Sequence, residues 1–205
     1  MYVKHGGKFS MRDSYFENIT SLKTVPFVII ENYWVNLVNI TVVNTHMGST
    51  LFYFFKCEMI GLIQVSFKNI RQQQIDLRQL SEYENKFHLQ GICMTITDGG
   101  LFSLSESNFT DVYSTAIYVE IDQSISLVGA NNYIIQCLFD NSNLQLDPSL
   151  AKNSQGVTWV YISGVESIIM SGLQFLYNRL SPKYGGVTHY LLNVLTERPY
   201  ILRVN

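Results

Sequence analysis

Apolar residues fall in short runs along this chain, each bounded by Gly, Asn, Ser or Asp. Runs of four to six residues bounded in this way are typical of short strands, in which residues two apart share a face. One type of run recurs with Phe or Val at its centre, and the central residues are 26, 25, 42, 30 and 36 positions apart. A basic period of about 25 residues with insertions accounts for these intervals. This anchor series comprises 14–18, 40–44, 65–69, 107–111, 137–141 and 173–177.

Two further series of apolar runs lie between the anchor runs, always in the same order. Strands of this length could also form a sandwich, but a sandwich needs hairpin turns, and Asp98-Gly99 alone has a hairpin sequence. A constant order of strand types favours parallel stacking instead. The first series comprises 27–30, 51–55, 92–96, 116–121, 157–162 and 187–192, and the middle series 34–38, 60–63, 101–104, 125–128 and 167–170.

The pattern therefore predicts an all-β protein, a right-handed parallel β-helix of six to seven three-stranded coils. We expect a single domain over residues 1–205, belonging to a longer chain or an assembly, because no polar or helical cap closes either end. An internal repeat supports this fold: the phrase that begins at Gly6-Gly7 returns at Gly99-Gly100, at a constant offset of 93 residues.

Two segments do not fit the period. Residues 71–90 carry apolar side chains at near-helical spacing, and residues 143–155 contain an Asp-Pro-Ser turn sequence. We expect both to be helical or loop insertions that leave the coils at the same corner. A recurrent insertion site on one edge of a repeat protein is often where its specific contacts lie.

A column of amide and carboxyl side chains follows the anchor runs. Each of these residues stands two positions after the central Phe or Val, so alternation places it on the inner face. We predict a ladder at one inner corner, in which side-chain amides bridge coils roughly 4.8 Å apart. Tyr177 interrupts the column in the last clear coil. The ladder consists of Asn18, Asn44, Asn69, Asp111 and Asn141.

The first series is apolar on both faces, and its outward positions are rich in aromatic residues. An aromatic stripe along one side of a stacked protein is a candidate surface for sugar rings or for another protein. The alternative is that the two insertions fold back over it. The stripe consists of Tyr53, Phe55, Tyr118, Trp159 and Tyr161.

The composition of the chain argues against several classes of function. A net charge of −2 and 15% charged residues argue against nucleic-acid binding, which needs a basic face. No apolar run approaches the roughly 20 residues that span a bilayer. Three cysteines without C-x-x-C spacing predict buried free thiols, and the four histidines lack ligand spacing, so we expect no metal site and no cofactor.

Three Asn-x-Thr sequons mark candidate glycan acceptors if the chain passes through a eukaryotic secretory route. Asn108 neighbours an inward Phe and should face solvent, whereas Asn39 lies at the bend before its anchor run. Asn18 also belongs to the predicted ladder, where a structural role competes with modification.

The short motifs resemble those of polymorphic outer-membrane proteins and related pectin-lyase-like right-handed β-helix proteins. Gly6-Gly7-Lys8-Phe9 and Gly99-Gly100-Leu101-Phe102 are similar to their Gly-Gly-x-aliphatic motif, Gly185-Gly186-Val187 matches its beginning, and Phe175-Leu176-Tyr177-Asn178 resembles their Phe-x-x-Asn motif. The resemblance specifies a fold better than a function, because one fold supports many activities. It implies either exported adhesins and surface components or polysaccharide lyases and hydrolases.

A polygalacturonase-type enzyme would carry paired acidic motifs on successive coils. Thr97-Asp98-Gly99 is the one fragment that fits, and Asp98 also reads as a turn residue beside two glycines. We therefore expect a non-enzymatic structural or adhesive protein, extracellular or at the cell surface, which binds other protein chains or copies of itself and can form a fibre. A polysaccharide-active enzyme or carbohydrate-binding module of the same fold is the alternative.

Overall fold

The computed structural model describes most of the chain in several segments. All structural statements below concern these residues. They are 1–22, 24–72, 92–112, 115–122, 124, 131–141, 143–144, 157–165, 167–177, 179–180, 189–195 and 201–204. Side chains are described for all of these residues except 72, 143–144, 157–159 and those after 177.

The described part of the protein is all-β, and its strands pair in parallel. Sheet A has the order β1 (Tyr2–Lys4), β4 (Phe27–Ile30), β6 (Phe52–Phe55), β8 (Met94–Gly99), β11 (Ile117–Ile121), β15 (Val157–Ser163) and β19 (His189–Leu195). Sheet B contains β2 (Lys8–Glu17), β3 (Thr20–Ser21), β5 (Trp34–Met47), β7 (Met59–Gln72), β9 (Leu101–Ser105), β10 (Asn108–Val112), β12 (Asn132–Ile135), β13 (Leu138–Asp140), β16 (Ser167–Ser171), β17 (Gln174–Leu176) and β20 (Ile201–Val204). A small pair joins β14 (Asn143–Leu144) to β18 (Arg179–Leu180).

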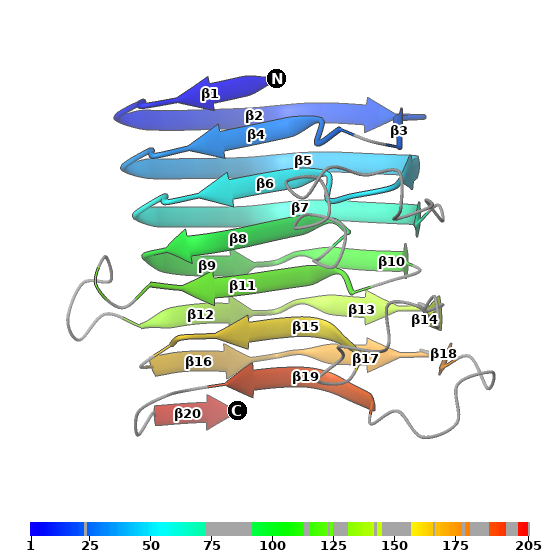
Figure 1. Ribbon diagram of the computed structural model, residues 1–205. Coiled ribbons are helices and arrows are strands. Elements are labelled where there is room, and N and C mark those ends of the chain that lie inside the picture. The colour runs from blue at the N-terminus through cyan, green and yellow to red at the C-terminus, as the bar shows by residue number, and fades with distance from the viewer. Residues whose placement is uncertain are drawn as a thin grey trace, which may run out of the picture.

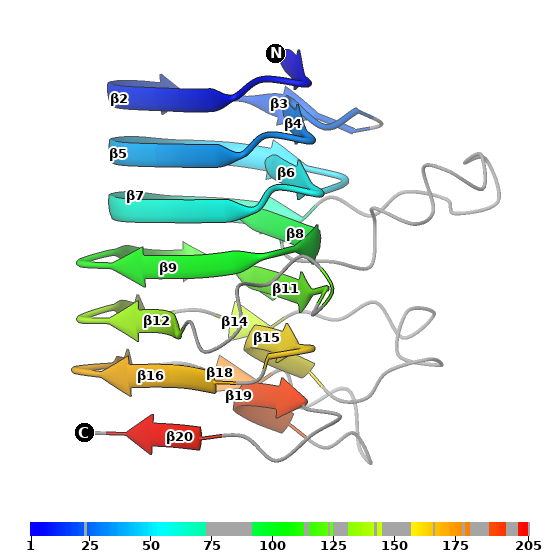
Figure 2. The same cartoon turned by 90° about the vertical axis from the view of Figure 1, so that its left-hand side faces the viewer.

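The chain passes from sheet A to sheet B and back, and each passage lies below the previous one (Figure 1). We call each passage a rung. The described termini lie at opposite ends of the stack, and the two sheets face each other across it (Figure 2). The register of the parallel strands in sheet B places the central residues of the anchor series side by side, rung after rung. The predicted alignment of this series is confirmed. These central residues are Phe16, Val42, Phe67, Phe109, Phe139 and Phe175.

Two details of the strand prediction are wrong. The middle and anchor runs form separate strands in the later rungs, but in β2, β5 and β7 they join into single strands of 10 to 14 residues. In the fifth rung the middle position belongs to β12, not to 125–128, because Tyr133 pairs with Ser103. The sequence hides this strand because Asn132 occupies an interior position. Its side chain accepts a hydrogen bond from the Phe102 N–H (2.9 Å) and donates one to the Ser167 carbonyl (3.1 Å).

Both predicted insertions begin later in the chain than expected. Arg71 and Gln72 belong to β7, and Asn143 and Leu144 form β14, so these four residues are strand instead of helix or loop. Residues 73–90 and 145–155 lie outside the described residues.

Three bends per rung have a left-handed backbone. Among the described residues, fifteen non-glycine residues and two glycines have a positive φ. They fall into three corner columns, separated by eight and then five residues within every rung that shows all three. The first corner column is His5, Glu31, Lys56, Asp98 and Gly164; the second is Asp13, Asn39, Gln64, Glu106, Gln136 and Gly172; the third is Asn18, Asn44, Asn69, Asp111, Asn141 and Tyr177.

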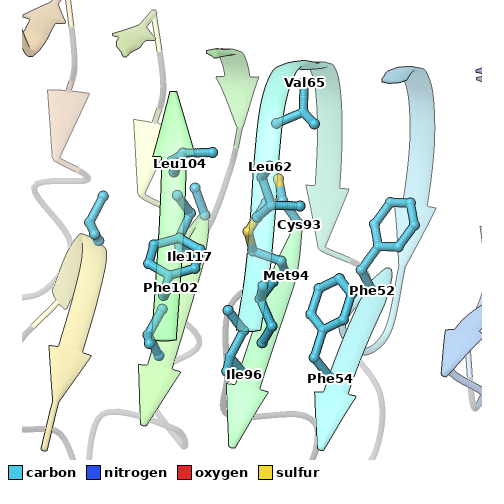
Figure 3. Close-up of a cluster of buried hydrophobic side chains, with 14 of the residues drawn as sticks. Phe52, Phe54, Leu62, Val65, Cys93, Met94, Ile96, Phe102, Leu104 and Ile117 are labelled. Atoms are coloured by element: carbon cyan, nitrogen blue, oxygen red, sulfur yellow. The ribbon is translucent and has the colours of Figure 1, made fainter. Parts of the chain in front are cut away.

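The space between the sheets holds one hydrophobic cluster that runs through the rungs. Side chains of β6 and β8 meet those of β7 and β9 inside it (Figure 3). Phe67, Phe109, Phe139 and Phe175 form an uninterrupted stack with ring centroids 5.4, 4.9 and 4.9 Å apart and nearly parallel planes. Such offset stacks add a little to the stabilisation that comes from burying the rings.

Removing a ring from the middle of this stack should destabilise the protein strongly. Phe109 is fully buried, so Phe109→Ala should lower the free energy of unfolding by about 3–5 kcal/mol. Phe175 is half-buried, so Phe175→Ala should cost about 1–2 kcal/mol. Urea denaturation of both variants measures the difference, and equal losses would contradict the packing described.

The repeated Gly-Gly pairs occupy equivalent positions three rungs apart, since Lys8, Trp34, Met59 and Leu101 share one register line. Their surroundings differ. A Cβ atom on Gly100 would lie 2.3 Å from the backbone oxygen of Glu58, whereas a Cβ on Gly7 would meet nothing within 4 Å. Close approach of the backbone of the rung above therefore explains the glycine at position 100.

Gly100→Ala should therefore lower the free energy of unfolding by about 1–3 kcal/mol, because backbone atoms must move apart. Gly7→Ala is the matched control and should change it by less than about 0.5 kcal/mol. Thermal or urea unfolding of both variants tests the pair. A Gly100→Ala protein as stable as the wild type would show that the rungs are not this close.

Candidate contact faces and corner columns

The stack presents three outward faces. The first face is the outer side of sheet A. The second face is the outer side of sheet B before the second corner column, and the third face is its outer side after that column. Because side chains alternate along a strand, each face is set by every second residue.

The predicted aromatic stripe lies on the first face, where Tyr53 is buried and Phe55, Tyr118 and Tyr161 are half-buried. Tyr53 is 5% exposed; its ring stacks on Phe55 (6.3 Å), and its hydroxyl is 2.8 Å from the Thr97 hydroxyl. Tyr118 and Tyr161 stack on each other with centroids 4.6 Å apart and are half-buried. Tyr53 is therefore not available as part of a contact surface, and the side chain of Trp159 lies outside those described.

Burial also affects the ionisation of the tyrosines on the first face. It raises the pKa of Tyr118, with a further rise from the hydrogen bond that its hydroxyl donates to Glu120 (2.6 Å). Burial likewise raises the pKa of Tyr161. These phenols are packing groups that remain protonated at neutral pH.

The second face has a different character. In its strands, eight of the outward side chains are apolar and none is acidic. Trp34 is 41% exposed and Ile63 is 38% exposed. Basic residues occur at both ends of this face: Lys8 and Arg12 lie in the N-terminal rung, and Arg203 of β20 is the register partner of Ile169. Lys8 Nζ lies 5.1 Å from the centre of the Trp34 ring. The apolar set is Trp34, Val38, Met59, Ile63, Leu101, Tyr133, Ile135 and Ile169.

Sequence reasoning missed this face because the register was needed to find it. Val38 and Ile63 are 25 positions apart, yet they are direct neighbours on adjacent strands. The available signal was the composition of the middle runs, which carry apolar residues at outward as well as inward positions.

The third face is more polar. Its outward positions include Glu17, Lys68 and Asp140, together with hydroxyl and amide side chains, and also two exposed apolar residues, Tyr15 (62% exposed) and Leu176 (42% exposed). Asn108 lies here, exposed, between Ser66 and Leu138 on the neighbouring strands. A charged face of this kind remains in contact with water.

The predicted Asn ladder is the third corner column. Asn69 Nδ2 donates to Asn44 Oδ1 (2.8 Å), and Asn141 Nδ2 donates to Asp111 Oδ1 (2.5 Å). The ladder differs from the prediction in its position, because its members are exposed or half-exposed instead of facing the interior. The left-handed backbone interrupts the strand alternation and turns each side chain outward at the bend. Among the described side chains, no hydrogen bond joins Asn69 to Asp111 or Asn18 to Asn44.

The other two corner columns also carry side-chain pairs between rungs. Asn39 Nδ2 donates to Asp13 Oδ1 (2.8 Å), and Gln64 Nε2 donates to Glu106 Oε2 (2.9 Å). In the first corner column, His5 Nδ1 lies 2.5 Å from Glu31 Oε2. These exposed pairs align the corners, and each contributes little to stability.

The backbone at a corner, more than its side-chain amide, should determine which residues are tolerated there. Asn44→Gly and Asn44→Val both lose the amide, but only valine is strained at a φ of 54°. The valine variant should be less stable than the glycine variant by about 1–2 kcal/mol. Urea denaturation measures the gap, and equal stability of the two would rule out a left-handed corner at this position.

The remaining candidate groups are placed as follows. Cys57, Cys93 and Cys137 are buried free thiols, as expected, and burial raises the pKa of each. Asp98 is a corner residue with a φ of 50°, which supports its interpretation as a turn residue. The described residues contain no group of three or more His, Cys, Asp and Glu side chains that could hold a metal ion.

No helix among the described residues has the length and hydropathy that crossing a membrane requires. No protein-family model matches the sequence, and a search of curated proteins finds no match.

Proposed function

We propose that the protein is a non-enzymatic structural component, extracellular or at the cell surface, whose copies associate with one another. Its fold in this proposal is a right-handed parallel β-helix. The exposed apolar second face is the observation that carries the proposal, because contiguous apolar surface on a soluble protein commonly marks a site of protein contact. The resemblance of its Gly-Gly and Phe-x-x-Asn motifs to surface β-helix proteins supports the location.

The corner spacing supports the β-helix. Separations of eight and five residues recur in the first four rungs and in the sixth, and the five-residue separation recurs in the fifth. They recur even though the connection from the third corner of one rung to the first corner of the next varies greatly in length. Insertions can therefore occur without altering the stack. Such a stack is a rigid support with few groups available for chemistry, which suits a structural role.

The middle of the second face suits contact with a second copy. Its strand positions carry no acidic residue, and its basic residues lie at the two ends, Lys8 and Arg12 in the first rung and Arg203 at the register position beside Ile169. The outward strand positions of the rungs between these ends are uncharged. Contact through this uncharged middle buries apolar side chains without bringing like charges together.

The end of the stack supplies a second contact. Among the described strands, β2 pairs with β5 alone, and the inward residues Phe9, Met11 and Phe16 are half-buried instead of buried. An edge of this kind can add another parallel strand. A second copy or a preceding segment of a longer chain could supply that strand, and addition of copies at this edge would extend a fibre.

Electron microscopy and sedimentation velocity of the purified chain test the proposal. We expect concentration-dependent assemblies. Ile63→Lys places a charge in the middle of the second face and should reduce assembly at least tenfold, measured as the concentration at which half of the protein is assembled. Gln174→Lys adds the same charge to an exposed position on the third face and should leave assembly unchanged.

Two outcomes would contradict self-association. One is a monomer at all concentrations. The other is equal disruption by the two lysine variants, which would show that net charge matters and the apolar face does not. Circular dichroism of both variants must first show an intact fold.

Carbohydrate binding is the second candidate function, and the exposure of the Trp34 ring favours it, since aromatic rings can stack on sugar rings. Binding to a panel of insoluble polysaccharides separates the candidates. Retention by a polysaccharide that is lost in Trp34→Ala would favour a carbohydrate-binding module over a self-associating component.

A further inference from the structure

The three sequons occupy two different structural settings. Asn18 and Asn39 belong to corner columns and have a left-handed backbone, with φ of 57° and 54°. Asn108 lies in β10, in extended backbone on the third face. The structure therefore separates three acceptors that the sequence motif alone treats as equivalent.

Asn108 is the sequon asparagine that combines an available side chain with extended backbone, whereas Asn18, also exposed, has the left-handed backbone of a corner. The Asn108 side chain is exposed, and no hydrogen bond among the described residues engages its amide. Phe109, the next residue, points inward and is fully buried, so the strand is anchored independently of the Asn108 side chain. Ser66, the register neighbour on β7, is small and leaves room beside the amide.

The hydroxyl of the sequon lies on the same side as the acceptor. Thr110 is two residues beyond Asn108 in the same strand, and in a strand such residues share a face. Asn39 is placed differently, because its Nδ2 donates to Asp13 Oδ1 at 2.8 Å and aligns two rungs. A sugar on that nitrogen would lie within the second corner column, where neighbouring side chains are about one strand spacing, roughly 4.8 Å, away.

We propose that Asn108 carries an N-linked glycan when the protein passes through a eukaryotic secretory route. In the transfer, the anomeric carbon of an oligosaccharide leaves the diphosphate oxygen of a polyisoprenyl diphosphate carrier and bonds to Asn108 Nδ2. The amide nitrogen gives up one proton, and the carrier diphosphate departs as the leaving group. No oxidation or reduction occurs.

A glycan at Asn108 has a consequence for assembly, and this part rests on the proposed function. A branched sugar keeps the third face in water and prevents close packing there. The second face lies on the other side of the second corner column and stays free. Modification would therefore direct lateral contact between copies to the second face.

Expression in cultured eukaryotic cells with an added secretion signal tests the acceptor. We expect the secreted chain to lose mass on treatment with a peptide-N-glycosidase. Asn108→Gln and Thr110→Ala should each remove one glycan, and Thr110→Ser should retain it because the hydroxyl remains. Asn39→Gln is the matched control and should leave the mass of the attached glycan unchanged.

An unmodified secreted protein, or an Asn108→Gln protein with an unchanged glycan mass, would overturn the assignment. The mass measurement does not depend on self-association, so its outcome is distinct from that of the proposed function.

A second variant tests the choice of face. Val38→Thr completes a sequon that starts at Asn36, and both residues point outward on the second face. A glycan there should prevent assembly, whereas the glycan at Asn108 should permit it. If the Val38→Thr protein is glycosylated at Asn36 by mass and assembles as the wild type does, the directing role of the Asn108 glycan is wrong even when Asn108 is occupied.

Discussion

The structure depends on a backbone constraint: in each rung whose three corners are all described, three residues adopt the left-handed conformation, at a fixed spacing. For residues other than glycine this conformation costs roughly 1 kcal/mol, with Asn and Asp affected least. The strands offset this cost, because a bend at every corner lets each strand segment bury its inward side chains and pair with the rungs above and below. Asn44 and Asn69, for example, are both bent, and they remain in register and hydrogen-bonded to each other.

Fixed spacing makes the rungs interchangeable. When every rung bends at equivalent positions, the inward residues of one rung lie over those of the next, as in the stack of Phe67, Phe109, Phe139 and Phe175. The variable connection follows the third corner column in most rungs and lies outside this repeat. The same regularity creates the three faces, so that an apolar surface with no acidic side chain in its strands can form from residues 25 to 42 positions apart.

Much of this arrangement follows from the sequence. The line of anchor residues, the parallel pairing and the third corner column were predictable, because Phe and Asn recur at recognisable positions. The first and second corner columns were not, since Lys56, Gln64 and Glu106 belong to residue types that give no signal for a left-handed backbone. The strand at 132–135 was missed for a similar reason, because buried Asn132 replaces an apolar residue and bonds to the backbones on either side.

The faces were harder to predict. Alternation correctly places Tyr53 on the outer side of sheet A, but alternation does not determine whether an outward side chain is covered, and Tyr53 is buried. The exposed apolar surface lies instead around Trp34 and Ile63. Identifying it required the register between rungs, which a sequence with insertions of unequal length leaves open.

Cross-linking between neighbouring rungs is the sharpest test of the stacking that the left-handed corners produce. Ser66 and Asn108 are register neighbours across the longest insertion, so cysteines placed at both positions should form a disulfide on mild oxidation, detectable by peptide mapping. Neighbouring strands are roughly 4.8 Å apart, within the Cα separation that a disulfide requires. Cysteines at Ser66 and Leu138, two rungs apart, should not pair. A bond in the second pair and none in the first would contradict the stacked arrangement.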